Sequence, residues 1–311
     1  MNVVDSSAWL SYFAGDKNSA FFHKTVKSRN SRNRIDTIQI VDGSWVDRED
    51  DPNQFLTHFQ NFLGTPHTTF PIRDPVSLFT NKLSNVQAAS MLTPVSDIEI
   101  KLALFQMGDD KAPGPDGFTA KFFKSTWDVV GKDVCLAVRE FFTSGKLLKS
   151  LNSTILALIP KSVAPSRVTD FSPIACCNVL YKCISKINAD RLKGHLPLLV
   201  NENQSAFIPG RLITDNVLHV QDLMRGYHKQ RGPPRCAFKV DIQKAYDTVD
   251  WHFLRTTLFG FGFPLTMIDW IMTCVSTASY SVSINGNLHG YFKGGRGLRQ
   301  GGPSPPTSSP W

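Results

Sequence analysis

Residues 237–251 read AFKVDIQKAYDTVDW, and this stretch decides the expected fold. Its first residues alternate in polarity, which predicts a strand with Phe238, Val240 and Ile242 on the face toward a core. Asp241 falls at the end of this strand, on the opposite face. A carboxylate at the end of a rigid strand can hold a metal ion, and it can equally cap the helix that follows. The stretch alone leaves both interpretations open.

Length and composition indicate a folded, basic protein. A chain of 311 residues can form one large domain or two ordinary ones. A hydrophobic fraction of 41% is enough for a packed core, which excludes a disordered chain. The formal net charge of +8 favours a polyanionic partner, most simply nucleic acid. A generally basic protein without such a partner has the same composition.

The six cysteines form no Cys-x-x-Cys pair, and no histidine lies near them at zinc-finger spacing. We therefore expect reduced, mostly buried thiols in an intracellular protein, located in the nucleus or the cytoplasm. No apolar run reaches the length of a membrane span. The first residues lack a basic start followed by an apolar block, so no secretory signal is predicted.

The region before residue 96 is predicted to connect and to bind rather than to catalyse. Residues 17–34 carry six basic side chains and no acidic one, and aromatic residues interrupt them. Such a run can follow a phosphate backbone and stack on bases, or it can form a solvated helix face. Its candidate nucleic-acid contacts are Lys24, Lys27, Arg29 and Arg32. Residues 42–94 are rich in Pro, Thr and Asn and are expected to form a connector with short helices.

Apolar spacing predicts a series of helices and one hairpin in the rest of the chain. A helix begins at Ser96, which forms a capping box with Glu99, and Ile98, Leu102 and Phe105 follow at helical spacing. The other expected elements are a buried strand at 152–161, helices at 121–142, 174–192, 251–259 and 265–275, and a hairpin of SYSVSI and LHGYF around Asn-Gly.

Six segments, in this order, resemble the reverse transcriptase of plant non-LTR (LINE-type) retrotransposons. They are KAPGPDGF at 111–118, LIPK at 158–161, DFSPIACCNVLYK at 170–182, NQSAFIPGR at 203–211, the opening stretch, and GLRQG at 297–301. The resemblance covers residues 96–301. It implies an α+β, right-hand polymerase fold, with fingers at 96–235 and a partial palm at 236–301. Residues 1–95 look like the basic linker upstream of such a polymerase.

The resemblance also implies a site and its ligands. Asp241 matches the first catalytic carboxylate of the palm, a Mg²⁺ ligand in two-metal nucleotidyl transfer. Tyr246 matches the residue that excludes a ribose 2′-OH. The implied partners are an RNA template, a DNA primer and dNTPs. The nucleotide contacts implied by the match are Lys244, Ala245, Tyr246 and Gln300, and the contact near the template is Arg211.

The sequence departs from the family where catalysis is concerned. Ser172 replaces the arginine that contacts the triphosphate, and serine supplies no fixed cation. The Ala-Asp-Asp box with the second palm carboxylate is absent, and no Asp or Glu follows Asp269. We therefore expect an RNA-directed DNA polymerase by family that is inactive as this chain alone. The alternative is a non-catalytic, nucleic-acid-binding remnant of a degenerate retroelement.

Residues 302–311 read GPSPPTSSPW, where the family continues Asp-Pro-Leu-Ser-Pro. A plausible coding sequence for a typical member, read one base out of phase, spells residues 303–311 and then stops. We therefore expect a frameshifted tail that begins near Gly301 or Gly302. A palm sheet that lacks the second carboxylate hairpin keeps an unpaired edge, which predicts poor solubility of the isolated chain.

Overall fold

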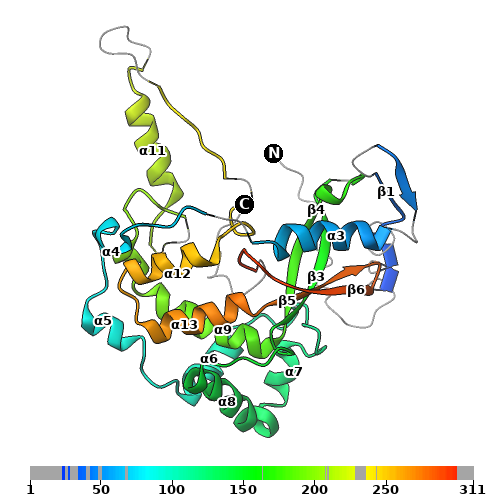
Figure 1. Ribbon diagram of the computed structural model, residues 1–311. Coiled ribbons are helices and arrows are strands. Elements are labelled where there is room, and N and C mark those ends of the chain that lie inside the picture. Colours follow the sequence, from blue (N-terminus) through cyan, green and yellow to red (C-terminus); the bar gives the residue numbers. More distant parts are fainter. Residues whose placement is uncertain are drawn as a thin grey trace.

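A four-stranded sheet lies at the centre of the computed structural model, which describes residues 23–24, 27–28, 34–39, 43–47, 51–66, 69–162, 164–206, 208, 210–227, 236–242 and 244–299. The strand order is β4-β3-β5-β6. The strands are β3 (Ser153–Pro160), β4 (Phe171–Cys177), β5 (Ser279–Ile284) and β6 (Asn287–Lys293). Together with the helices around it (Figure 1), this sheet makes a mixed helix-and-sheet fold that fits the expected α+β class.

The middle of the sheet joins distant parts of the chain. Strand β3 pairs antiparallel with β4 and parallel with β5. The amide of Asn152, just before β3, donates to the hydroxyl of Thr277, 125 residues later, at 2.7 Å. Strands β5 and β6 form the predicted hairpin, and Asn285 and Gly286 at its turn have φ of 51° and 86°. Positive φ at both turn residues matches the right-handed twist of the strands.

Helices cover the sheet and extend to one side of it. Helix α3 (Asp51–Gly64) lies across the sheet (Figure 1), and Phe55 meets the Phe171 ring edge-on with centroids 5.4 Å apart. The helices beside the sheet include α6 (Asp97–Phe105), α7 (Ala120–Ser125), α8 (Trp127–Ser144), α9 (Val179–Lys193), α12 (Trp251–Gly260) and α13 (Leu265–Ser276). The remaining elements are β1 (Thr37–Gln39), β2 (Trp45–Asp47), α4 (Pro75–Leu78), α5 (Asn85–Ser90), η1 (Val168–Asp170), α10 (Leu196–Leu199) and α11 (Ile213–Met224).

One hydrophobic core runs through these elements. It includes Phe55, Phe59 and Leu63 on α3, which are spaced four residues apart and therefore share one face of the helix. The stretch predicted to be a connector thus contributes a full helix to the core. The boundary between residues 95 and 96 stays a prediction, and residues on both sides of it pack together.

Several predicted elements are confirmed. Helix α8 ends where Gly145 adopts φ of 68°, and β3, α12 and α13 lie within one or two residues of their expected bounds. All six cysteines are free, and four of them are buried, as predicted. Among the residues that the structure describes, no helix has the length and apolar character needed to cross a membrane.

The start of one predicted helix needs correction, and the predicted helix after Ser96 is confirmed. Residues 174–177 belong to β4, because this stretch pairs with β3, and the helix α9 begins only at Val179. In α6 the cap at Ser96 is confirmed, since its side chain accepts from Glu99 N at 3.2 Å. The helix predicted from the spacing of Ile98, Leu102 and Phe105 is present, and these three side chains lie on its exposed side, whereas Ile100 and Leu104 are fully buried. Helix α6 carries apolar residues on all of its sides, and its contacts with α8 and α9 determine which of them are buried.

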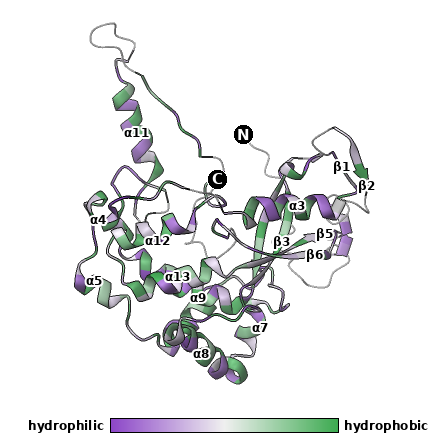
Figure 2. Ribbon diagram, in the orientation of Figure 1, coloured by the Kyte–Doolittle hydropathy of each residue, from purple (hydrophilic) through white to green (hydrophobic). Residues whose placement is uncertain are grey.

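The strand predicted at 237–241 is not formed. This segment is extended without a ladder, and Phe238, Val240 and Ile242 are 86%, 81% and 71% exposed. A strand needs a hydrogen-bonded neighbour, and none of the strands in the described residues pairs with it. Helix α11, which has no buried residue, projects nearby and carries green apolar residues among purple polar ones (Figure 2).

Candidate nucleotide-binding site

A tight turn at residues 244–249 carries the predicted nucleotide contacts. Asp247 N donates to Lys244 O at 3.0 Å, and Thr248 Oγ1 donates to the same oxygen at 3.1 Å. Lys244 has φ of 53°, a left-handed conformation that costs a residue with a Cβ about 1 kcal/mol. Its ammonium lies 4.0 Å from the centroid of the Phe62 ring on α3, a cation–π contact that favours this conformation.

The loop at residues 294–299 binds this turn through its backbone. Leu298 N donates to Tyr246 O at 2.7 Å, and Gly297 N donates to Val249 O at 2.8 Å. In return, the indole of Trp251 donates to Gly297 O at 2.9 Å. Gly297 has φ of 81°, and a Cβ there would lie 2.5 Å from Asp247 O. Only glycine fits, so the two predicted segments meet because of this residue.

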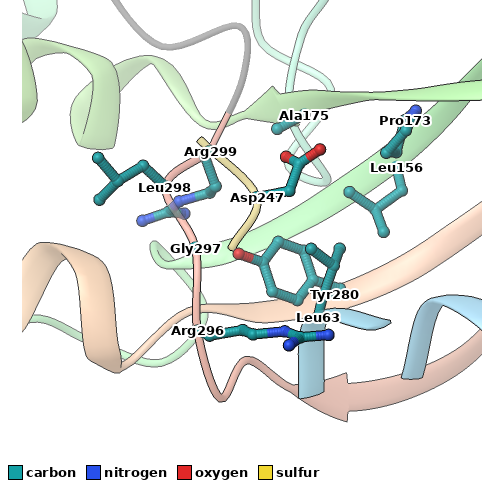
Figure 3. A pocket seen from close by; sticks show the side chains of 10 residues that line it. All are labelled: Leu63, Leu156, Pro173, Ala175, Asp247, Tyr280, Arg296, Gly297, Leu298 and Arg299. Atoms are coloured by element: carbon teal, nitrogen blue, oxygen red, sulfur yellow. The ribbon is translucent and has the colours of Figure 1, made fainter. Parts of the chain in front are cut away.

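The other side of the loop rests on the end of α3. Gly295 N donates to Leu63 O at 2.7 Å, and Arg296 Nε donates to Phe62 O at 2.6 Å. An arginine at this end of a helix satisfies free carbonyls and complements the helix dipole. A cavity of about 10 Å³ lies behind the loop, with the buried Asp247 in its wall (Figure 3). That volume holds at most one water.

Arg299 closes the loop on the opposite side from Arg296, and Figure 3 shows Gly297 and Leu298 between them. The guanidinium of Arg299 lies 3.7 Å from the centroid of the Tyr181 ring. Its nitrogens donate to side chains and a carbonyl around β3 and α13. Burial raises the pKa of Cys274 to about 12, against the opposing effect of Arg299, so this thiol stays neutral.

Positive charge gathers at the outer side of the turn. Burial lowers the pKa of His58 on α3 below its usual 6.5, and the charges of Lys244 and Lys161 lower it further. Burial, followed by Lys161, also lowers the pKa of Lys244, whereas Asp247 raises it. Mutually repelling cations beside an exposed turn attract anions such as phosphate.

The structure brings some of the predicted site residues together. Lys244, Ala245 and Tyr246 lie on one turn, and Tyr246 is bonded to the GLRQG segment. Asp241 is exposed in the unpaired segment before the turn. It does not cap the following helix, because Asp250 does so, with its carboxylate accepting from Phe253 N at 2.7 Å. Gln300, Arg29 and Arg32 lie outside the described residues, and Lys24 and Lys27 are exposed.

Arg211 has an intramolecular role in this structure. Its guanidinium donates to the carbonyls of Asn201, Gln204, Pro197 and Val200 at 2.5–3.0 Å. Two of these carbonyls flank or belong to α10, whose end the arginine therefore caps. Whether it also contacts a template stays a prediction.

The described residues do not by themselves provide a Mg²⁺ site. Mg²⁺ prefers several oxygen ligands in octahedral geometry. Among the described residues no group of three or more His, Cys, Asp or Glu is placed to hold a metal ion. Asp241 therefore offers one exposed carboxylate, and a metal ion held there would need further ligands from outside the described residues.

Comparison with known proteins gives the class of this site. Residues 159–309 match the family described as reverse transcriptase (RNA-dependent DNA polymerase). The match includes the turn at 244–249, the loop at 294–299 and strands β4, β5 and β6. This part of the chain is similar to reverse transcriptase domains, in agreement with the motifs.

Relatives extend the similarity beyond this domain. The Transposon TX1 uncharacterized 149 kDa protein of Xenopus laevis is 30% identical over 93% of this chain and 22% of its own length. The Pol polyprotein from the type-2 retrotransposable element R2DM of Drosophila melanogaster is 28% identical over 63% of this chain and 18% of its own length. The chain thus spans about a fifth of the length of these relatives, and it is similar to proteins of non-LTR retrotransposons.

Sequence reasoning missed several residues that build the site. Phe62 and His58 lie in a stretch rich in Asn and Thr that was read as a connector, although the spacing of Phe55, Phe59 and Leu63 marks a helix. Arg299 lies in GLRQG, and the motif assigned no role to it. Its burial depends on contacts with distant elements, which no local pattern reveals.

Proposed function

We propose that this chain forms the fingers and the first part of the palm of a right-hand, RNA-directed DNA polymerase from a plant LINE-type retroelement. One observation carries the proposal: the 2.7 Å bond from Leu298 N to Tyr246 O joins two motifs that are separate in sequence. In the proposed site, Tyr246 selects the deoxyribose, Lys244 and Ala245 approach the triphosphate, and Gln300 faces the template base. The plant origin rests on the motifs alone.

In the proposed reaction the primer 3′-oxygen bonds to the α-phosphorus of a dNTP paired with the RNA template, pyrophosphate leaves, and the 3′-OH proton goes to water. Asp241 would supply one ligand of the Mg²⁺ that stabilises the charge of this step. Two-metal chemistry requires opposed carboxylates. The sequence encodes no Ala-Asp-Asp box, and no acidic residue follows Asp269. We therefore propose that the chain alone incorporates no nucleotide, and that a second carboxylate hairpin is needed to complete the site.

A chimeric polymerase tests this proposal. The segment of the Xenopus TX1 relative that follows its own match to this chain is fused after Gly301. We expect Mg²⁺-dependent DNA synthesis on poly-rA/oligo-dT by the chimera and none by the 311-residue chain. Asp241→Ala abolishes synthesis by the chimera. Asp250→Asn is the matched control, because Asn still caps α12. Synthesis by the unmodified chain, or unchanged synthesis by the Asp241→Ala chimera, contradicts the proposal.

A second candidate function is nucleic-acid binding without catalysis. It is favoured by the net charge of +8 and by the exposure of Lys24 and Lys27. The two functions predict different results for the chimera, since a remnant with a decayed site stays inactive after the missing hairpin is supplied.

A further inference from the structure

We propose that Arg299 is a positioning residue: it fixes the loop that holds the Tyr246 turn, and thereby sets the selection of deoxyribose over ribose. This inference rests on the proposed function of Tyr246. The Arg299 side chain lies among β3, α9 and α13, and its hydrogen bonds and ring contact are made there rather than with Lys244, Ala245 or Tyr246.

The guanidinium is held from three directions. Nη1 donates to Thr154 Oγ1 at 2.9 Å, and Nη2 donates to Asn152 Oδ1 at 2.5 Å. A further bond from Nη2 reaches Cys274 O on α13 at 2.6 Å. The ring of Tyr181 on α9 covers one face of the planar group at 3.7 Å. A planar donor with fixed directions, held in this way, has one position and one orientation.

These contacts are not the ones expected if the only role of Arg299 were to raise the stability of the fold. The bonded partners are an amide, a hydroxyl, a carbonyl and, at 4.0 Å, the thiol of Cys177, and none of them is a carboxylate. Burying a cation costs free energy that neutral acceptors only partly offset. An apolar side chain of similar size fills such a space without that cost. The arrangement therefore favours a role in geometry, which the rigid fork provides and a flexible side chain does not.

The residues next to Arg299 bind the Tyr246 turn directly, so the position of Arg299 affects the position of the turn. Leu298, next to Arg299, donates to Tyr246 O, and Gly297 donates to Val249 O. These two long-range backbone bonds hold the turn, while the described segment before it, 236–242, is exposed and belongs to no strand ladder. The position of Tyr246 therefore depends on the loop, and one end of the loop depends on Arg299.

Hydrogen exchange of the full chain tests the positioning step. Arg299→Met and Arg299→Lys both remove the fork, and the lysine keeps the charge. We expect the amides of Gly297 and Leu298 to exchange at least tenfold faster relative to the amides of the β3–β5 ladder. Using the ladder as reference removes any general loss of stability. Arg191→Lys is the matched control, because Arg191 is also buried, hydrogen-bonded to Glu99 and placed on an aromatic ring.

Nucleotide selection tests the consequence. Binding of dUTP and UTP, which differ only in the 2′-OH, is measured with the same variants on poly-rA/oligo-dT. We expect the preference of the wild-type chain for dUTP to fall at least fivefold in both Arg299 variants and in Tyr246→Val, and to persist in Arg191→Lys. The inference is overturned by an unchanged exchange ratio, by an equal change in Arg191→Lys, or by an unchanged preference despite faster exchange. If the wild-type chain shows no preference, the proposed role of Tyr246 fails, and the exchange ratio still decides whether Arg299 positions the loop.

Discussion

Asn285 and Ile35 exchange two hydrogen bonds across 250 residues. The Asn285 side chain accepts from Ile35 N at 2.9 Å and donates to Ile35 O at 2.7 Å. The tip of the β5–β6 hairpin thereby holds the start of the described N-terminal segment, so the region before the family match is attached to the sheet.

Removing the two hydrogen bonds between Asn285 and Ile35, here called the clasp, lowers the stability of the fold. In Asn285→Gly the turn keeps its positive φ, so only the side-chain bonds are lost. We expect the free energy of unfolding in urea to fall by about 1–2 kcal/mol, because two partly buried backbone groups lose their partners. Gly286→Ala is a contrasting variant, since it strains the turn at φ of 86° and leaves the clasp in place. Equal stability of Asn285→Gly and wild type contradicts the prediction.

The ion pair of Glu99 and Arg191 joins α6 to α9. Arg191 Nε and Nη2 each lie 2.9 Å from one oxygen of the Glu99 carboxylate, and the Arg191 side chain is only 9% exposed. Glu99→Gln leaves a buried cation unbalanced, and we expect a loss of about 1–3 kcal/mol in urea unfolding. Asp269→Asn breaks the exposed pair with Arg255 and is expected to cost less than about 1 kcal/mol. A larger loss of unfolding free energy in Asp269→Asn than in Glu99→Gln would contradict the prediction.

His58 makes stability depend on pH. Its folded pKa lies below the usual 6.5 because of burial, Lys244 and Lys161. The unfolded chain therefore binds the proton first, and the stability linked to this group is lost as the pH falls below 6.5. We expect His58→Gln to reduce the fall of the melting temperature between pH 7 and pH 5. The exposed His252→Gln serves as the control, and an identical fall in both variants counts against the prediction.

The basic N-terminal residues and Arg211 are expected to behave differently toward nucleic acid. Neutralising Lys24, Lys27, Arg29 and Arg32 together should lower the slope of log affinity for single-stranded RNA against log salt by up to about 3. Arg211→Gln removes one charge, so it should change that slope by at most about 0.7. It should lower the melting temperature, because Arg211 donates to four backbone carbonyls. Affinity that is indifferent to salt removes the case for a phosphate-binding segment.

The exposed apolar segment predicts self-association. Replacing Phe238, Val240 and Ile242 with threonine should raise the monomer fraction in sedimentation without lowering the melting temperature, since these side chains are 71–86% exposed. Threonine replacement of the buried Ile100, Leu104 and Ile184 should instead unfold the chain. An unchanged monomer fraction in the first variant would show that association uses another surface.

Local signals predicted the elements that depend on local structure. The Asn-Gly turn, the cap at Ser96 and the positive φ of Gly145 each follow from a few neighbouring residues. The strand at Phe171–Cys177 was mistaken for a helix start, because a short apolar run fits either structure until β3 is known to pair with it. Burial of Arg299 likewise requires Asn152 and Cys274, which lie far away in sequence.

The parallel pairing of β3 with β5 has a consequence for synthesis of the chain on the ribosome. Ser153 pairs with Ser279, so β3 can bond to β4 early but must wait for more than a hundred further residues before its second edge is covered. At about 5–20 residues per second this delay lasts roughly 6–25 s. During that time the nascent chain presents an open strand edge, which can pair with other chains until β5 covers it.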